Sequence, residues 1–313
     1  MAFQAPVETS SGKIREITLG TKKTVAVGGQ NALAFHGFEG TLPNAPKIAL
    51  EVYDSAPADW GEELKSALGD VWGDPVAWAT KCEGAFGADM VCLQLAGTDP
   101  NGLNRSTADA VATVKAVAGA ISVPLIVYGS GNIERDAEVL KAVAEATQGM
   151  NVVVGAAVEE NYKSIGAAAM GFGCKVIGQT PIDVNMAKQL NILLTNLGVK
   201  IENLLIDPST GALGYGLEYS FSIHERIKLA ALKQNDTMLQ APTVANLGKE
   251  AWRAKEAKIT SAEAPQWGDQ RKRGIVWESL TALALVMAGS DILIMRHPEA
   301  AKLVRQTVAG LNA

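Results

Sequence analysis

Short runs of β-branched and apolar residues alternate along the chain with longer Ala-rich segments, in which apolar residues recur at helical spacing. The short runs predict strands at Lys47–Val52, Asp89–Leu95, Pro124–Tyr128, Met150–Val154, Cys174–Ile177, Asn203–Ile206, Thr237–Val244 and Asp291–Met295. The longer segments predict helices at Asp74–Ala88, Ser106–Ala120, Glu134–Thr147, Val158–Gly173, Pro181–Leu197, Tyr219–Lys233, Gly274–Ala288 and Pro298–Ala309. Strand–helix units in series, with strands that are apolar on both faces, indicate a parallel sheet covered by helices.

Eight is the strand number at which a closed parallel barrel fills with its own side chains, so we predict an α/β fold of the TIM (β/α)8 barrel type. A doubly wound open sheet is the alternative. Ahead of the repeat, Ile14–Gly20 and Thr24–Val27 predict a hairpin that plugs the amino-terminal end of the barrel. We expect residues 1–313 to form one domain, with the hairpin and lead-in over 1–46 and the barrel over 47–313.

Two predicted connections are much longer than the others, Asp54–Gly73 after the first strand and Asn246–Arg273 after the seventh. In a parallel barrel both would rise from the carboxyl-terminal face, where barrel ligands bind. Four of the six tryptophans lie in these two insertions: Trp60, Trp72, Trp252 and Trp267. The rings either anchor long loops or form a surface for a bulky ligand or a partner protein. We expect a partner interface here, with Trp60 or Trp267 as its anchor.

The chain has 313 residues, of which 48% are hydrophobic and 19% are charged, so it can bury a large core. Its formal net charge of −5 provides no basic surplus for sequence-independent binding of nucleic acid. No apolar run reaches the roughly 18 residues of a membrane span, and charges occur throughout Met1–Gly20. The sequence therefore predicts no membrane span, no signal peptide and a cytoplasmic location.

The chain offers few groups for metal binding or covalent catalysis. Cys82, Cys92 and Cys174 stand far apart, and no two histidines have the spacing of metal ligands, so we expect reduced thiols and neither a zinc site nor an iron–sulfur cluster on this chain. No G-x-S-x-G motif is present. Lys47 and Lys175 begin their predicted strands, at the wrong end for an aldolase or lyase lysine.

The predicted strand ends carry mostly amides, hydroxyls and glycines, which hold a polar ligand by hydrogen bonds rather than attack it. Gly129-Ser-Gly-Asn132 could cradle an anion on backbone N–H groups, but a tight turn with Asn132 as helix cap is favoured. The glycines of Asp207–Gly216 permit close backbone approach to something flat, and we expect Asp207 to order this loop rather than to act as a base. We expect His297 to cap the final helix beside Pro298.

Several stretches resemble the small subunit of the corrinoid iron–sulfur protein, the family also called the delta subunit of acetyl-CoA decarbonylase/synthase. The resemblance runs from about residue 14 to the C-terminus, and its most specific piece is the long loop Asp207–Tyr219. The other stretches are Gly28-Gly-Gln30, Phe35-His-Gly-Phe-Glu-Gly40, Ala49-Leu-Glu-Val-Tyr-Asp54 and Asp74-Pro-Val-Ala-Trp-Ala79.

The resemblance implies a TIM barrel related to pterin-binding methyltransferases and a heterodimer with a large subunit that carries a [4Fe–4S] cluster and a cobalamin domain. The corrinoid would lie between that domain and the barrel mouth of this chain. The heterodimer would carry a methyl group from methyltetrahydrofolate:corrinoid methyltransferase to acetyl-CoA synthase in the Wood–Ljungdahl pathway. This chain would then be a non-catalytic subunit that holds no metal itself and binds neither nucleic acid nor membrane.

On this interpretation the contacts to the amide arms of the corrin come from side chains and amides that crown the strands. They are expected among Gln94, Thr98, Ser130, Asn132, Gln179, Ser209, Thr210, Gly211 and Asn246. The alternative is a stand-alone pterin-dependent methyltransferase on the same fold, which would hold its pterin with Asp and Asn residues near the second, third and sixth strands.

Overall fold

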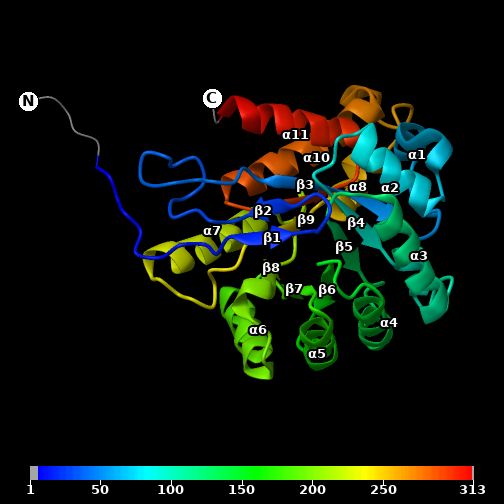
Figure 1. The fold of residues 1–313 in the computed structure, drawn as a ribbon. Coiled ribbons are helices and arrows are strands. Elements are labelled where there is room, and N and C mark those ends of the chain that lie inside the picture. The colour runs from blue at the N-terminus through cyan, green and yellow to red at the C-terminus, as the bar shows by residue number, and fades with distance from the viewer. Residues whose placement is uncertain (1–5, 312–313) are drawn as a thin grey trace, which may run out of the picture.

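In the computed structural model, which describes residues 6–311, eight parallel strands form a barrel surrounded by helices (Figure 1). The sheet order is β8-β7-β6-β5-β4-β3-β10-β9, and β8 and β9 are joined by a single parallel bridge between Ile206 and Thr243. The TIM-barrel prediction is confirmed. The strands are β3 Lys47–Tyr53, β4 Met90–Gln94, β5 Leu125–Tyr128, β6 Val153–Ala157, β7 Lys175–Gln179, β8 Leu204–Asp207, β9 Val244–Asn246 and β10 Ile292–Met295.

One major helix follows each strand of the barrel, and Ser106 and Asn132 cap two of them by accepting backbone N–H groups. Gly173 and Gly198 end two others in the left-handed conformation. Between residues 6 and 311, no helix combines the length and the apolar content needed to cross a bilayer. The major helices are α2 Pro75–Gly84, α3 Thr107–Ala120, α4 Ile133–Ala146, α5 Tyr162–Phe172, α6 Val184–Leu197, α7 Leu217–Lys233, α10 Gln270–Met287 and α11 Pro298–Leu311.

Several element boundaries differ from prediction, among them the starts of β9, β6 and α6. The seventh strand was placed at Thr237–Val244, but β9 starts only at Val244, because Asp236 accepts the N–H of Met238 and turns the preceding chain. The fourth strand begins three residues late, after Gly149 and Asn151 adopt positive φ. Helix α6 starts after Asp183, whose carboxylate caps it, so Pro181 lies outside the helix.

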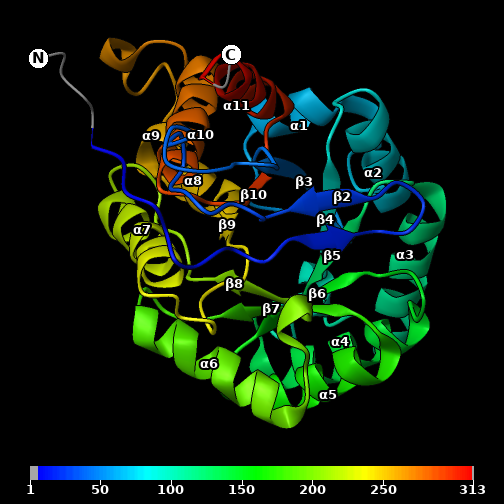
Figure 2. The same cartoon turned by 60° about the vertical axis from the view of Figure 1, so that its left-hand side comes forward.

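The hairpin consists of β1 Ile17–Leu19 and β2 Val25–Val27, which pair antiparallel. Figure 2 shows it lying across one end of the barrel. Its alternate residues Ile17, Leu19, Val25 and Val27 are buried and pack with the lowest interior residues of the strands, including Met90 of β4. The expected plug is confirmed.

The two insertions lie at the opposite end of the barrel from the hairpin (Figure 1). The first contains α1 Glu62–Leu68 and the 3-10 turn η1 Gly69–Val71, and the second contains α8 Gly248–Arg253, α9 Lys255–Lys258 and the turn η4 Pro265–Trp267. Two more 3-10 turns, η2 Ala96–Thr98 and η3 Ile201–Asn203, lie within barrel connections. The two longest insertions of the chain therefore both lie on the carboxyl-terminal face of the barrel, the mouth.

The plug should contribute measurably to stability. Leu19 is fully buried, so L19A removes apolar contacts at the base of the barrel and should lower the free energy of unfolding by about 2–5 kcal/mol. Urea unfolding of the variant and its parent measures the change. The control L103A alters a side chain that is 65% exposed and should change stability by less than about 0.5 kcal/mol. Equal effects of the two substitutions would show that the hairpin is not part of the core.

Candidate functional site at the barrel mouth

The inward-facing side chains at the carboxyl ends of the strands form a polar layer above the apolar interior. Glu51 of β3 is fully buried and forms an ion pair with Arg296, with Oε2 and Nε 2.6 Å apart. Gln94 at the end of β4 donates to Glu51 Oε1 at 3.1 Å, and Arg296 also donates to the Tyr53 hydroxyl at 3.0 Å. Burial alone would lower the pKa of Arg296, but Glu51 and Tyr53 outweigh it and raise that pKa.

Asp207, the last residue of β8, is the centre of a second group of contacts. Its carboxylate accepts from the Tyr128 hydroxyl at 3.0 Å, from Gln179 Nε2 at 2.9 Å and from the backbone N–H of Ser209 at 2.9 Å. Burial raises the pKa of Asp207 to about 6, although these three hydrogen bonds act to lower it. The bond to Ser209 holds the start of the following loop, as the sequence predicts.

The Gly129–Asn132 turn is already filled by a carboxylate of the chain itself. Asp136 Oδ1 accepts from the N–H and the hydroxyl of Ser130 at 2.7 and 2.9 Å, and Asp136 Oδ2 accepts from the N–H of Gly131 at 2.9 Å. A Cβ atom on Gly129 would lie 2.2 Å from Asp136 Cγ. The anion-cradle alternative is therefore wrong, and the favoured interpretation of Asn132 as a helix cap is correct, since it accepts from the N–H of Arg135.

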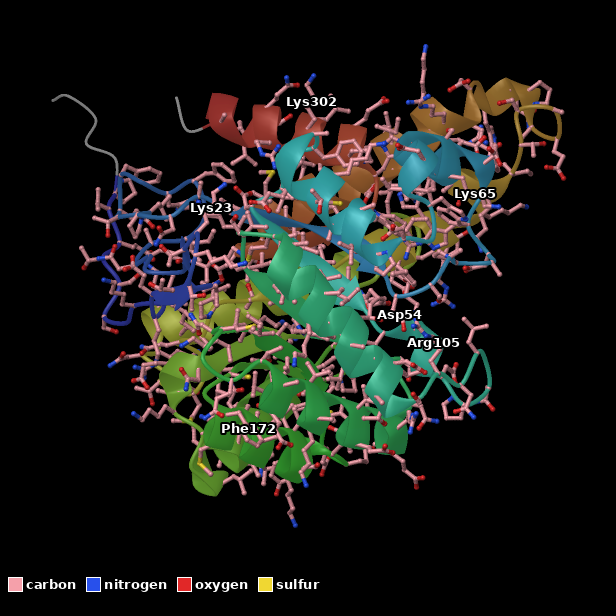
Figure 3. The ribbon with its side chains drawn as sticks, turned by 45° about the vertical axis from the view of Figure 1, so that its right-hand side comes forward. Lys23, Asp54, Lys65, Arg105, Phe172 and Lys302 are labelled. Atoms are coloured by element: carbon pink, nitrogen blue, oxygen red, sulfur yellow. The ribbon has the colours of Figure 1, made fainter. Side chains whose placement is uncertain are left out.

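The first insertion is fixed to the mouth by aromatic packing and by one buried carboxylate. Trp60 is only 5% exposed, and the Arg296 guanidinium lies 4.1 Å from its ring centroid. Trp60 also packs edge-on against Trp78. At the start of the insertion, Asp54 lies beside Arg105, with Oδ2 3.7 Å from Nη1 (Figure 3), and accepts from the N–H of Gly97.

The second insertion is held through Glu278 of α10. This buried carboxylate accepts from Trp252 Nε1 at 2.7 Å and from the backbone N–H groups of Arg296 and His297. Burial raises the pKa of Glu278 to about 7, against these hydrogen bonds. His297 Nδ1 accepts from the N–H of Glu299 at the start of α11, so its expected capping role is confirmed.

The structure uses some of the predicted ligand-binding residues internally. Thr98 is fully buried, and its hydroxyl donates to the Leu95 carbonyl at 2.7 Å, so it has no surface from which to contact a ligand. Ser130 is bonded to Asp136, as described above. The N–H of Gly211 donates to the Ser220 hydroxyl at 2.6 Å, and a Cβ atom there would lie 2.6 Å from the Tyr215 carbonyl oxygen. Gly211 is required by the fold of its own loop.

Other predicted residues keep unused hydrogen-bonding capacity. Thr210 Oγ1 and Asn246 Oδ1 are buried without a protein partner. Gln179 and Ser209 line a cavity of about 540 Å³ between the ends of β7 and β8, the connection from β6 to α5, and helices α4 and α6. The cavity wall is mostly apolar and includes Ile133, Val158, Met186, Leu190 and Leu193; its ionisable lining residues are Glu159 and Glu160. The arrangement suits a large ligand with amide groups at its edge.

No group of three or more metal-ligating side chains comes together between residues 6 and 311. Cys82 on α2, Cys92 on β4 and Cys174 just before β7 are all buried. Burial raises the pKa of each thiol.

The sequence interpretation overlooked the two buried glutamates that organise the mouth. Glu51 interrupts the apolar run of its strand, and Glu278 interrupts an apolar helix. A charged residue inside an apolar run is a usable signal, because such a residue is rarely fully buried unless it is paired. The sequence could not have named the partners, since Arg296 and Trp252 come from other elements.

The family comparisons agree with this architecture. A family profile described as "CO dehydrogenase/acetyl-CoA synthase delta subunit" matches residues 16–308. The chain belongs to this family. It is 37% identical to the acetyl-CoA decarbonylase/synthase complex subunit delta of Archaeoglobus fulgidus, covering 97% of this chain and 70% of that protein. Identity to the Methanothermobacter thermautotrophicus subunit delta is 36%, over 97% of this chain and 77% of that protein.

Among solved structures, this delta-family chain resembles dihydropteroate synthases. The Xanthomonas albilineans enzyme superposes with a TM-score of 0.58 at 13% identity, covering 90% of this chain and 98% of that one. The Coxiella burnetii enzyme, solved in complex with pteroic acid, gives a TM-score of 0.56 at 11% identity, covering 96% and 100%. At these identities the likeness concerns the fold alone.

The titration of Asp207 generates a prediction for stability. Its pKa rises from the ordinary 3.8 to about 6 on folding, so between these pH values the folded protein retains a proton that the unfolded chain has released. Raising the pH through this window should therefore lower the free energy of unfolding of the parent protein, by about 3 kcal/mol, relative to D207N. Denaturant unfolding of both proteins from pH 4 to pH 7 measures the difference; a constant difference across the range would contradict it.

Proposed function

We propose that this chain is the small, non-catalytic subunit of a corrinoid methyl carrier, and that its barrel mouth caps a cobalamin held jointly with a large subunit. The observation that carries the proposal is the mouth cavity, which combines an apolar wall with the Gln179 amide and the buried, unpartnered Thr180 hydroxyl. Family membership supports it, because the similar proteins are named as subunits of the acetyl-CoA decarbonylase/synthase complex.

The residues at the mouth fit the periphery of a corrin. Its amide arms need both donors and acceptors, which Gln179, Ser209, Thr210 and Asn246 provide. Thr210 Oγ1 and Asn246 Oδ1 are buried acceptors without a protein partner, and such atoms are stabilised when a ligand supplies the missing hydrogen bond. When bound, the corrinoid supplies a cobalt centre that carries the methyl group.

The state of the three buried carboxylates at the mouth supports the proposed non-catalytic role. Glu51, Asp207 and Glu278 are all fully buried, and each is bonded to protein donors rather than open to the cavity. A general acid or base must reach its substrate, so these carboxylates act by positioning the mouth. We further propose that the [4Fe–4S] cluster belongs to the large subunit, and that methyltetrahydrofolate:corrinoid methyltransferase and acetyl-CoA synthase are the exchange partners in the Wood–Ljungdahl pathway.

A pterin-dependent methyltransferase is the second candidate. Buried Asp207 lies at the end of β8, and neighbouring β9 ends in Asn246 with its unpartnered carbonyl, and such a pair could bind the polar edge of a pterin. Purification separates the candidates. A cobalt- and iron-containing heterodimer supports the carrier, whereas a colourless homodimer that turns over methyltetrahydrofolate supports the methyltransferase.

Metal analysis provides a direct test of the carrier proposal. The chain expressed alone should retain little cobalamin and no stoichiometric iron, and co-expression with the large subunit should yield a heterodimer that contains both cobalt and iron. The physical reason is that the proposed cobalamin site is completed only by the second subunit. Stoichiometric iron on the isolated chain would overturn the proposal.

The second insertion should contribute to the subunit interface through Trp267, which is 40% exposed. W267A should weaken association with the large subunit by about 2 kcal/mol, roughly thirtyfold, with an unchanged melting temperature. W60A is the matched comparison, because the Trp60 ring is pinned inside its own chain and its loss should reduce stability by about 3–5 kcal/mol. Calorimetric titration and thermal unfolding separate the effects, and unaltered association of W267A would exclude it as an anchor.

A further inference from the structure

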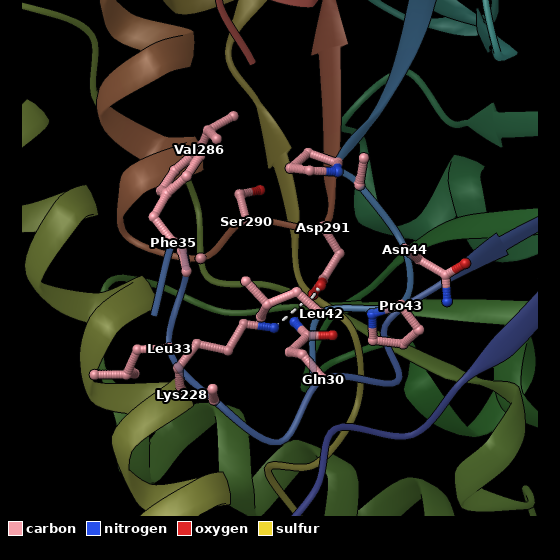
Figure 4. Close-up of a pocket in the computed structure, with 15 residues that line it drawn as sticks. Gln30, Leu33, Phe35, Leu42, Pro43, Asn44, Lys228, Val286, Ser290 and Asp291 are labelled. Atoms are coloured by element: carbon pink, nitrogen blue, oxygen red, sulfur yellow. Dashed lines mark hydrogen bonds and ion pairs between the residues drawn. The ribbon is translucent and has the colours of Figure 1, made fainter. Parts of the chain in front are cut away.

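A second cavity lies at the opposite, amino-terminal end of the barrel, and the mouth function makes no use of it. It has a volume of about 380 Å³ and is bordered by the segment from Gln30 to Pro46, by α7, by the end of α10 and by the connection from α10 to β10. Figure 4 shows Lys228 and Gln30 converging on Asp291 at its polar side. Two of the stretches that carry the family resemblance, Gly28–Gln30 and Phe35–Gly40, contribute to this region and not to the mouth.

The polar side of this cavity is built around a buried ion pair. Lys228 is 2% exposed, and its Nζ lies 2.5 Å from Asp291 Oδ2. Asp291 also accepts from Gln30 Nε2 at 2.6 Å and from the N–H of Thr243 at 2.6 Å, so both carboxylate oxygens are used. The Lys228 stem passes over Gly289, where a Cβ atom would lie 3.0 Å from Lys228 Cγ. The lysine head is therefore held in place by the fold.

Hydrogen-bonding capacity remains on two of these groups. A lysine ammonium has three donors, and Asp291 is the hydrogen-bonding partner of the Lys228 ammonium among the described residues. Gln30 Oε1 is a buried acceptor without a protein partner. A ligand that offers one acceptor and one donor side by side would satisfy both groups, which is the pattern of a carboxamide.

The charge balance of the cavity selects a neutral ligand. Lys228 and Asp291 are its charged lining residues, and their charges cancel. A carboxylate ligand would lie beside Asp291, and an ammonium ligand beside Lys228, in each case without a free counter-charge in a buried site. The wall also includes the apolar side chains of Leu33, Phe35, Leu42, Pro43 and Val286, against which a compact apolar body can pack.

The loop over the cavity is preformed. Asn31 and Thr41 clasp its two arms, because Asn31 Oδ1 accepts from the N–H of Thr41 at 2.6 Å and the N–H of Asn31 donates to the Thr41 carbonyl. Phe35 lies in the left-handed region at φ 60°, which a bulky residue adopts only where its surroundings impose it. Ligand cavities of this size are typically preformed in the same way.

We propose that this basal cavity binds a small neutral molecule with a carboxamide head and an apolar body. The head would accept from Lys228 and donate to Gln30 Oε1, and the body would lie against Leu33, Leu42 and Val286. The proposal concerns the face opposite the mouth and does not depend on the corrinoid function.

The experiment compares three probes that share a ring and differ in the charge of the head: benzamide, benzoate and benzylamine. Saturation-transfer NMR with the full chain should show saturable benzamide binding, with a dissociation constant on the order of 1 mM for so small a molecule. Benzoate and benzylamine should bind at least about tenfold more weakly, because each introduces an uncompensated charge. No benzamide saturation, or equal affinity for all three probes, would overturn the proposal.

Site assignment uses substitutions that fill the cavity. L42W should abolish benzamide binding, and A34L is a second filling variant in case the first does not fold, as judged by circular dichroism. The control L103W places the same indole on an exposed loop far from the cavity and should leave binding unchanged. Benzamide binding that survives in a folded filling variant would place the ligand elsewhere and refute the assignment.

Discussion

The mouth of the barrel depends on the buried ion pair between Glu51 and Arg296. These residues lie on β3 and at the end of β10, the first and last strands of the barrel, which are neighbours in the sheet. A buried charge is strongly destabilising once its partner is removed, by about 3–5 kcal/mol, so the pair fixes the relative position of the two strand ends. Gln94 and Tyr53 complete the hydrogen bonds of the pair, and Trp60 covers the guanidinium. The first insertion therefore rests on the same interaction that organises the barrel end.

The two ends of the barrel differ in polarity and in what covers them. At the amino-terminal end the hairpin covers the lowest apolar side chains and shields them from water. At the carboxyl-terminal end the interior becomes polar, and Glu51, Asp207 and Glu278 are each satisfied by donors from several elements. A stable end and a polar, loop-rich end are the usual division of a parallel barrel, and the division leaves the mouth free to acquire insertions without loss of the core.

Many polar groups at the mouth are hydrogen-bonded within the chain, which explains why polar residues at strand ends are poor guides to ligand contacts. The Asp136 carboxylate occupies a turn whose sequence resembles an anion-binding site, and the Thr98 hydroxyl donates to the carbonyl of Leu95. Thr210 and Asn246 occupy comparable places in the sequence but keep polar atoms without partners. The distinction between a structural and a ligand-facing polar group is therefore a property of the surrounding packing.

The sequence alone determined the order of the strand–helix units, the plugging hairpin, the caps at Ser106 and Asn132 and the stretches that resemble the family. Periodicity and capping are readable in this way because they depend on residues within a few positions of one another. The start of β9 could not be predicted, because the Asp236 side chain accepts the N–H of Met238 and forms a turn where the apolar residues indicate a strand. Only the tertiary structure decided which polar groups at the mouth are hydrogen-bonded within the chain and which have no protein partner. Their partners come from distant segments: Glu51 and Arg296 are separated by 245 residues, and Tyr128 and Asp207 by 79. Closure of the barrel brings such pairs together, and no local pattern encodes which atoms then meet.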